Sequence, residues 1–135
     1  MRIAADWLMT PGARAVCALL EGAGHQAWFV GGCVRNAVIG AAATDIDITT
    51  DARPDQVMDL ADKAHLRVVP TGIDHGTVTI IADGAPHEVT TFRRDVATDG
   101  RHAVVAFADS LEQDSARRDF TMNALYADAL GNVRD

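Results

Sequence analysis

Two adjacent glycines, Gly31 and Gly32, follow the apolar run HQAWFV and precede the segment CVRNAVIG, whose apolar residues recur at helical spacing. An apolar run that stops at two glycines is typical of a buried strand entering a tight turn. Gly40 ends the helical pattern. This order of strand, glycine turn and helix is the feature that most constrains the fold. The helix N-terminus and the backbone N–H groups of the turn also form an anion site.

The segment TDIDITT comes next and alternates polar and β-branched residues, which predicts a strand. In a strand Asp45 and Asp47 point to the same face, while Ile46 and Ile48 face the core. Two like charges side by side are costly unless a cation lies between them, and Mg²⁺ suits such oxygen ligands. A lone Asp-x-Asp is more often a solvated strand face, so that alternative stays open.

The residues that precede the two aspartates in the sequence favour a binding site over a solvated strand face. Arg35 lies in the first turn of the predicted helix and can add a charge-assisted contact to a phosphate at the glycine turn. Taken alone, Arg35 would be interpreted as a surface residue, and Gly31 with Gly32 would be interpreted as a structural turn. Their occurrence together, some ten residues before the Asp-x-Asp strand, indicates a metal beside a phosphate site and therefore a nucleotide.

Other local signals predict two further helices and a hairpin. Helices are predicted over residues 11–21 and 54–65, each beginning at a proline. Residues 76–93 predict a hairpin, because GTVTIIA and HEVTTFR flank the turn-rich DGAP.

The last third of the chain is less regular. Residues 95–105 lack periodicity and predict a mobile loop. The Ser-x-x-Gln capping box at Ser110 predicts a helix that begins there and runs through Arg117 and Arg118. The final segment, NALYADALGNVRD, predicts a strand, a Gly-Asn turn and the start of a second strand.

Two later segments carry further polar groups. Glu88, in HEVTTFR, would complete a carboxylate triad around two metals if its strand pairs beside the aspartate strand; an exposed Glu near a strand start is an equal alternative. In RRDFTMNAL, Arg117 and Arg118 could merely complement a helix dipole. That interpretation leaves Asp119 and Asn123 unexplained, whereas together these groups can bind a triphosphate and a ribose hydroxyl.

Composition limits the function classes. A chain of 135 residues, 48% hydrophobic and 23% charged, can bury the core of one domain. Its formal net charge of -7 argues against holding nucleic acid through a broad basic surface. The two cysteines lack metal-type spacing and fit reduced thiols. No stretch reaches the roughly 18 apolar residues of a membrane span, so we expect a soluble, cytoplasmic protein without a membrane partner.

Five motifs in order, GGCVRN, DIDI, HGTVTI, EVTTFRRD and RRDFTMNAL, resemble the head domain of the tRNA CCA-adding nucleotidyltransferases and the bacterial poly(A) polymerases, within the DNA polymerase β-like superfamily. The resemblance covers the chain from about residue 24 to the end. It implies an α+β fold with a small, mixed but mostly antiparallel sheet, flanking helices and carboxylates at the exposed end of the sheet. It also implies transfer of nucleotides from CTP and ATP to the 3′ end of tRNA, with release of pyrophosphate.

The resemblance implies roles for the carboxylates. Asp45 and Asp47 match the family's magnesium ligands, and Glu88 matches its third carboxylate, so two Mg²⁺ ions are implied in the catalytic complex. One ion would lower the pKa of the attacking 3′ hydroxyl, and the other would neutralise charge on the leaving pyrophosphate. No side-chain nucleophile is needed.

The resemblance also implies nucleotide contacts. Gly32 and Arg35 match the family's phosphate contacts, and Arg118 matches its triphosphate contact. Asp119 and Asn123 match the part of the motif implicated in ribose recognition.

The chain also departs from the family. Asn36 stands where the family usually has Asp, and since a neutral amide cannot replace a carboxylate as a metal ligand, we expect a structural role there. Residues 1–135 are interpreted as a truncated head domain, without the neck, body and tail domains that select the base and hold the tRNA. The fragment alone is therefore expected to be inactive or weakly active.

Two alternatives to CCA addition stay open. Poly(A) addition is one, because the head motifs do not separate the two activities well. A catalytically silent RNA-binding or regulatory module of the same fold is the other. The retention of three carboxylates and Arg118 speaks against the silent module, which has no need to hold repelling charges together.

Overall fold

The structure is a computed structural model, and it describes residues 3, 8, 10–39, 46–72, 76–98, 103–108, 110–116 and 125–134. The helices are α1 (Pro11–Gly22), α2 (Gly32–Ile39), α3 (Pro54–Lys63) and α4 (Leu111–Ala116). The strands are β1 (Trp28–Val30), β2 (Asp47–Thr50), β3 (Arg67–Gly72), β4 (Thr77–Ala82), β5 (Ala85–Thr91), β6 (Arg93–Thr98), β7 (Ala103–Phe107), β8 (Tyr126–Ala127) and β9 (Val133–Arg134).

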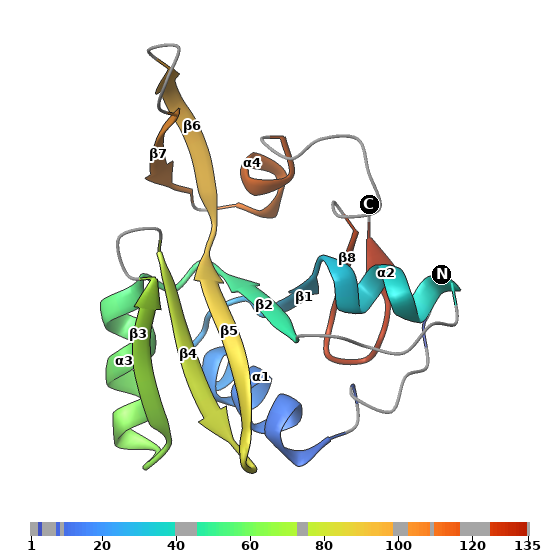
Figure 1. The fold of residues 1–135 in the computed structure, drawn as a ribbon, viewed down its shortest axis with the longest axis vertical. Helices are drawn as coiled ribbons and strands as arrows, with labels where there is room; N and C mark the ends of the chain where they lie inside the picture. Colours follow the sequence, from blue (N-terminus) through green and yellow to red (C-terminus); the bar gives the residue numbers. More distant parts are fainter. Residues whose placement is uncertain are drawn as a thin grey trace.

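The strands form a seven-stranded sheet of order β3-β4-β5-β2-β1-β8-β9 and a separate hairpin of β6 and β7 (Figure 1). Among the described strands every pair is antiparallel except β2 and β5, which run parallel. The α+β fold with a mixed, mostly antiparallel sheet and flanking helices is therefore confirmed.

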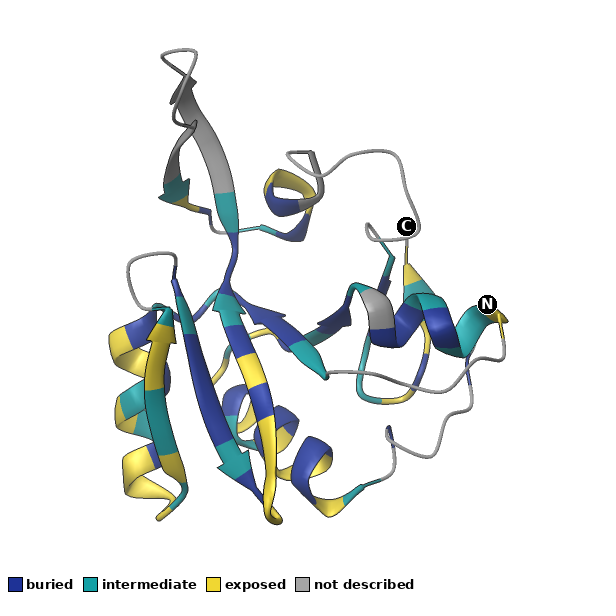
Figure 2. Cartoon of the chain, in the orientation of Figure 1, coloured by how far each residue is buried: buried dark blue, intermediate teal, exposed yellow. Residues whose placement is uncertain are grey.

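The main hydrophobic core lies between the sheet and the helices α1 and α3, which cover one of its faces (Figure 1). Val16 and Leu20 of α1 pack there with Ile48 of β2 and Ile80 of β4, all fully buried. Along β5, residues that face this core alternate with exposed residues (Figure 2). The period of two leaves the opposite face of β2 and β5 available to polar side chains.

The predicted helix starts and hairpin are confirmed. Thr10 caps α1, because its Oγ1 accepts a hydrogen bond from the N–H of Ala13 at 3.3 Å, and Pro11 follows at the first helical position. The hairpin of β4 and β5 turns at Asp83 and Gly84, whose φ angles of 53° and 76° suit the primed turns that match the twist of paired strands.

The prediction of a mobile loop over residues 95–105 is wrong for the part that the structure describes. Residues 93–98 and 103–107 are β6 and β7, an antiparallel pair with a register shift between Asp95 and Ala97. A bulge adds one residue to a strand and breaks the alternation of side chains. The register shift agrees with the absence of a strict period of two around residues 95–97.

Strand β3 was not predicted from the sequence, because Pro70 interrupts the run LRVVPTG. Proline cannot donate a hydrogen bond to a neighbouring strand and is tolerated mainly at sheet edges. Among the described strands β3 lies at the sheet edge and pairs with β4 alone, and its register shifts between Val69 and Gly72.

The end of the chain follows the sequence prediction. The N–H of Gln113 donates to Oγ of Ser110 at 3.2 Å, which confirms the cap of α4, although Arg117 and Arg118 lie outside the described residues. β8 and β9 form the predicted strand pair. No helix in the described ranges is long and apolar enough to cross a membrane.

The turn between β8 and β9 is organised by Asp128. Its Oδ1 accepts hydrogen bonds from the N–H groups of Leu130 and Asn132, each at 2.9 Å, and its Oδ2 accepts from Nδ2 of Asn132 at 3.0 Å. Burial opposes ionisation, but these hydrogen bonds outweigh it and lower the pKa of Asp128 below its usual 3.8.

Asp128→Asn is expected to destabilise the protein at neutral pH by about 1 kcal/mol or less, because solvent screens this partly exposed carboxylate. A lowered folded-state pKa means that the stabilisation is fully present above the unfolded-state pKa and is lost as the pH falls through the folded-state pKa. The difference in free energy of unfolding between wild type and variant should stay constant above about pH 5 and shrink below about pH 4. Urea titrations at several pH values measure it, and a difference that grows on acidification would contradict the prediction.

Candidate functional site

The parallel pair of β2 and β5 brings two carboxylates side by side. Asp47 and Glu88 are directly paired Cα partners, and the N–H of Glu88 donates to the carbonyl of Ile46 at 3.2 Å. The next pair, Ile48 and Val89, is buried in the core, so Asp47 and Glu88 point to the opposite face. The role predicted for Glu88 depends on a strand that pairs beside the aspartate strand. β5, which carries Glu88, does pair beside β2.

The glycine turn lies against the same carboxylate. Gly31 has φ +81°, a conformation that L side chains rarely adopt, and a Cβ placed on it would lie 3.7 Å from Oδ2 of Asp47. Val30, one residue earlier, pairs with Asp47 across β1 and β2. Helix α2 then begins at Gly32, with the N–H of Arg35 donating to the carbonyl of Gly31 at 3.0 Å. The glycine turn and the acidic strand are thus neighbours in space.

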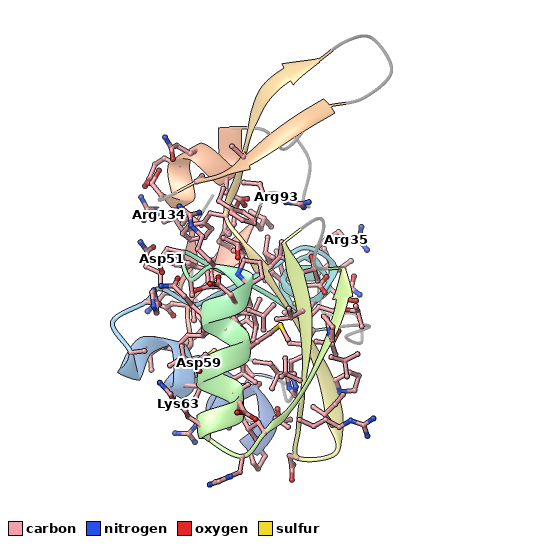
Figure 3. All side chains as sticks on the ribbon, turned by 90° about the vertical axis from the view of Figure 1, so that its left-hand side faces the viewer. Arg35, Asp51, Asp59, Lys63, Arg93 and Arg134 are labelled. Carbon is pink, nitrogen blue, oxygen red and sulfur yellow. The ribbon has the colours of Figure 1, made fainter. Side chains whose placement is uncertain are left out.

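Arg35 and Asn36 follow in α2. Arg35 is partly buried and extends from α2 toward the edge of the molecule, where Figure 3 labels it. Its Nε donates to Oδ1 of Asn36 at 3.4 Å, and Asn36 is only 8% exposed. Burial of the amide within the fold supports the expected structural role for Asn36, because a neutral group tolerates burial far better than a carboxylate would.

Both cysteines are free, in agreement with the expectation that they form no disulfide, and both are buried. Sγ of Cys33 donates to the carbonyl of Val30 at 3.5 Å. Burial raises the pKa of the Cys33 thiol, and the negative charge of nearby Asp47 also raises it. Burial, with a smaller effect of Glu21, raises the pKa of Cys17 to about 12. Neither thiol is a nucleophile at neutral pH, since thiolates are the reactive form.

The carboxylate face also carries hydroxyl groups that the sequence analysis did not single out. Oγ1 of Thr49 in β2 donates to the carbonyl of Thr90 in β5 at 3.0 Å, and the hydroxyls of Thr90 and Thr77 lie 2.9 Å apart. These residues occupy the row next to Asp47 and Glu88. The alternation of TDIDITT and HEVTTFR predicts that face for Thr49 and Thr90, but only the pairing reveals their contact.

The carboxylate oxygens of Asp47 and Glu88 are ligands of the kind that Mg²⁺ prefers. Asp47 and Glu88 offer carboxylate oxygens on rigid, paired strands, beside a turn whose lack of a side chain leaves the backbone accessible. Within the described ranges no three acidic, histidine or cysteine side chains gather as a metal cluster. The remaining predicted site residues lie outside the described part of the chain: Asp45, Arg118, Asp119 and Asn123.

Residues 27–135 match the family model of the poly(A) polymerase head domain. The chain belongs to this family. A CCA-adding enzyme of Bacillus cytotoxicus is 46% identical to this head domain over 125 residues, which are 91% of this chain and 30% of the relative. A CCA-adding enzyme of Bacillus mycoides is 43% identical over 125 residues, with the same coverage.

Two solved structures of related enzymes share the fold of this chain. The crystal structure of the Bacillus stearothermophilus CCA-adding enzyme in complex with CTP is 39% identical, with a TM-score of 0.79, over 94% of this chain and 30% of that chain. A tRNA nucleotidyltransferase complexed with a primer tRNA and an incoming ATP analogue is 26% identical, with a TM-score of 0.66. The chain therefore spans about 30% of the length of the curated relatives that it matches.

Proposed function

We propose that this chain is the head domain of a CCA-adding enzyme, which in the full-length protein transfers CMP and AMP from CTP and ATP to the 3′ end of tRNA. The observation that carries the proposal is the direct pairing of Asp47 with Glu88 beside the Gly31 turn. The likeness to CCA-adding enzymes, including one in complex with CTP, supports the substrate class.

In this proposal Asp45, Asp47 and Glu88 hold two Mg²⁺ ions. When bound, the metal supplies Lewis-acid activation of the attacking hydroxyl and neutralises charge on the pyrophosphate. The backbone N–H groups at Gly31 and Gly32 bind phosphate oxygens at the start of α2, where the helix dipole favours an anion.

The other predicted residues orient the nucleotide. Arg35 and Arg118 contribute charge-assisted hydrogen bonds to the triphosphate, and Asp119 with Asn123 binds the ribose. Arginine suits this task because its planar guanidinium remains charged at every physiological pH.

Residues 1–135 form the head domain in this proposal, and neck, body and tail domains of the full-length protein select the base and hold the tRNA. The head alone is expected to be inactive or weakly active. The cytoplasm is the proposed location, because two cysteines without a disulfide suit a reducing compartment.

The decisive experiment assays the full-length protein on tRNA that lacks its 3′ CCA, with CTP and ATP offered separately. We expect CMP incorporation from CTP alone, and AMP incorporation on a matched tRNA that already ends in CC. Incorporation of AMP without any CMP would identify a poly(A) polymerase instead. Binding of Mg²⁺ without any turnover would identify a catalytically silent module.

A further inference from the structure

Asp114 in α4 is a fully buried carboxylate to which the proposed reaction assigns no part. Its Oδ1 accepts a hydrogen bond from the backbone N–H of Arg93 at 3.0 Å, and its Oδ2 accepts one from the hydroxyl of Tyr126 at 2.8 Å. Arg93 begins β6, and Tyr126 begins β8. One side chain therefore joins three segments that are distant in the sequence.

The Asp114 contacts lie on the same face of the sheet as the candidate site. One transverse row crosses four strands through directly paired residues: Glu88, Asp47, Val30 and Tyr126. Val30 and Tyr126 form a second, smaller core with Phe92, Ala108 and Leu111. Leu111 and Asp114 hold α4 against β8, which lies two strands away from Asp47. This contact is near the base of the β6–β7 hairpin, where Figure 3 labels Arg93.

A buried carboxylate is an unusual way to hold a short helix, since removing a charge from water is unfavourable until its hydrogen-bond partners offset the lost hydration. Apolar contacts alone would hold α4 against the sheet, but they specify its orientation poorly. Hydrogen bonds to a charged acceptor have narrow geometry and fix direction. The contacts of Asp114 thus set the orientation of α4 relative to the row that contains Asp47.

We propose that Asp114 is a positioning residue: it fixes α4 against the row of paired residues that contains Asp47 and Glu88, and thereby sets the affinity of that site for a triphosphate. This inference rests on the proposed function, through the assignment of a triphosphate to Asp47 and Glu88. A hydrogen-bond network buried beside a site, without contact to the substrate, acts through geometry and therefore through affinity.

The test compares the affinity of the full-length protein for CTP, in the presence of Mg²⁺, by calorimetry in wild type, Tyr126→Phe and Asp114→Asn. We expect Tyr126→Phe to weaken binding roughly three- to tenfold, because it removes one hydrogen bond to a charged acceptor. Asp114→Asn should weaken it further, since the amide removes the charge as well. In turnover assays the change should lie mainly in KM for CTP rather than in kcat.

Thr91→Val is the matched control. The hydroxyl of Thr91 is buried and donates to the carbonyl of Ala52 at 2.6 Å, on the core side of the sheet away from α4. Like Tyr126→Phe, it removes one buried hydroxyl with little change in shape. Its free energy of unfolding should fall by a similar amount, while its affinity for CTP should equal that of wild type.

Equal CTP affinity in wild type and Tyr126→Phe would overturn the proposal, and so would equal weakening in Thr91→Val. Tyr126→Phe keeps the test decisive even if Asp114→Asn does not fold.

Turnover on tRNA tests the proposed function separately. A wild type that binds CTP but transfers no nucleotide rejects that function, while the affinity comparison still decides the role of Asp114. A wild type that binds no CTP rejects both.

Discussion

Replacing Asp47 by Asn in the full-length protein is expected to lower kcat for nucleotide transfer by roughly 10³-fold, with little change in the fold. Asn has the shape of Asp but no charge, so a metal held there would lose an anionic ligand that neutralises the triphosphate. A loss of about 4 kcal/mol in stabilisation of the transition state corresponds to a factor of this size. The measurement is CMP transfer from CTP to tRNA that lacks CCA, over a range of Mg²⁺ concentrations.

Asp62→Asn provides the control, because Asp62 is an exposed carboxylate on α3, which covers the opposite face of the sheet. Its kcat should equal that of wild type. Retention of more than a tenth of the wild-type rate by Asp47→Asn would show that Asp47 is no metal ligand. Unchanged Mg²⁺-dependent nucleotide binding after Asp45→Ala together with Asp47→Ala would reject the metal assignment altogether.

The second large effect concerns the contact of α1 with the sheet. Gly12→Ala is expected to destabilise the protein by about 3 kcal/mol, although alanine is the better helix former. A Cβ on Gly12 would lie 2.6 Å from the carbonyl oxygen of Ala82 and 2.8 Å from Cε1 of His87. The carbonyl belongs to a paired strand and His87 is buried, so α1 itself must move away from the core. Urea unfolding monitored by circular dichroism measures the change.

Gly22→Ala, at the other end of the same helix, is the matched control. A Cβ there would meet nothing within 4 Å. The substitution should cause no loss of stability and a gain of at most about 1 kcal/mol, because alanine lowers the entropy of the unfolded chain. A Gly12→Ala protein as stable as Gly22→Ala would show that α1 can shift on the sheet without loss of core packing.

Local sequence patterns were sufficient to predict the elements whose conformation depends on residues close to them in the sequence. The glycines at 31 and 32, the alternation around Asp47 and the Asp83-Gly84 turn each predicted the observed conformation, because sterics and burial act there over a few residues. The β6–β7 hairpin and β3 were missed, since a bulge and Pro70 break the period of two that identifies strands.

Contacts between distant segments could not be predicted from the sequence in the same way. The face of Asp47 follows from alternation, but its pairing with Glu88 depends on which strands the whole sheet brings together. Asp114 looks like an ordinary acidic residue in the first turn of a helix. Its burial arises from Tyr126 and Arg93, neither of which is adjacent to it in the sequence.

The parallel pairing of β2 and β5 also bears on how the protein folds. Its partners, such as Thr49 and Thr90, are 41 positions apart, so the chain must close a long loop before this contact stabilises it. The β4–β5 hairpin closes over a two-residue turn and should form first. Repulsion between Asp47 and Glu88 opposes the later step, so a divalent cation that binds only the folded pair should raise the melting temperature.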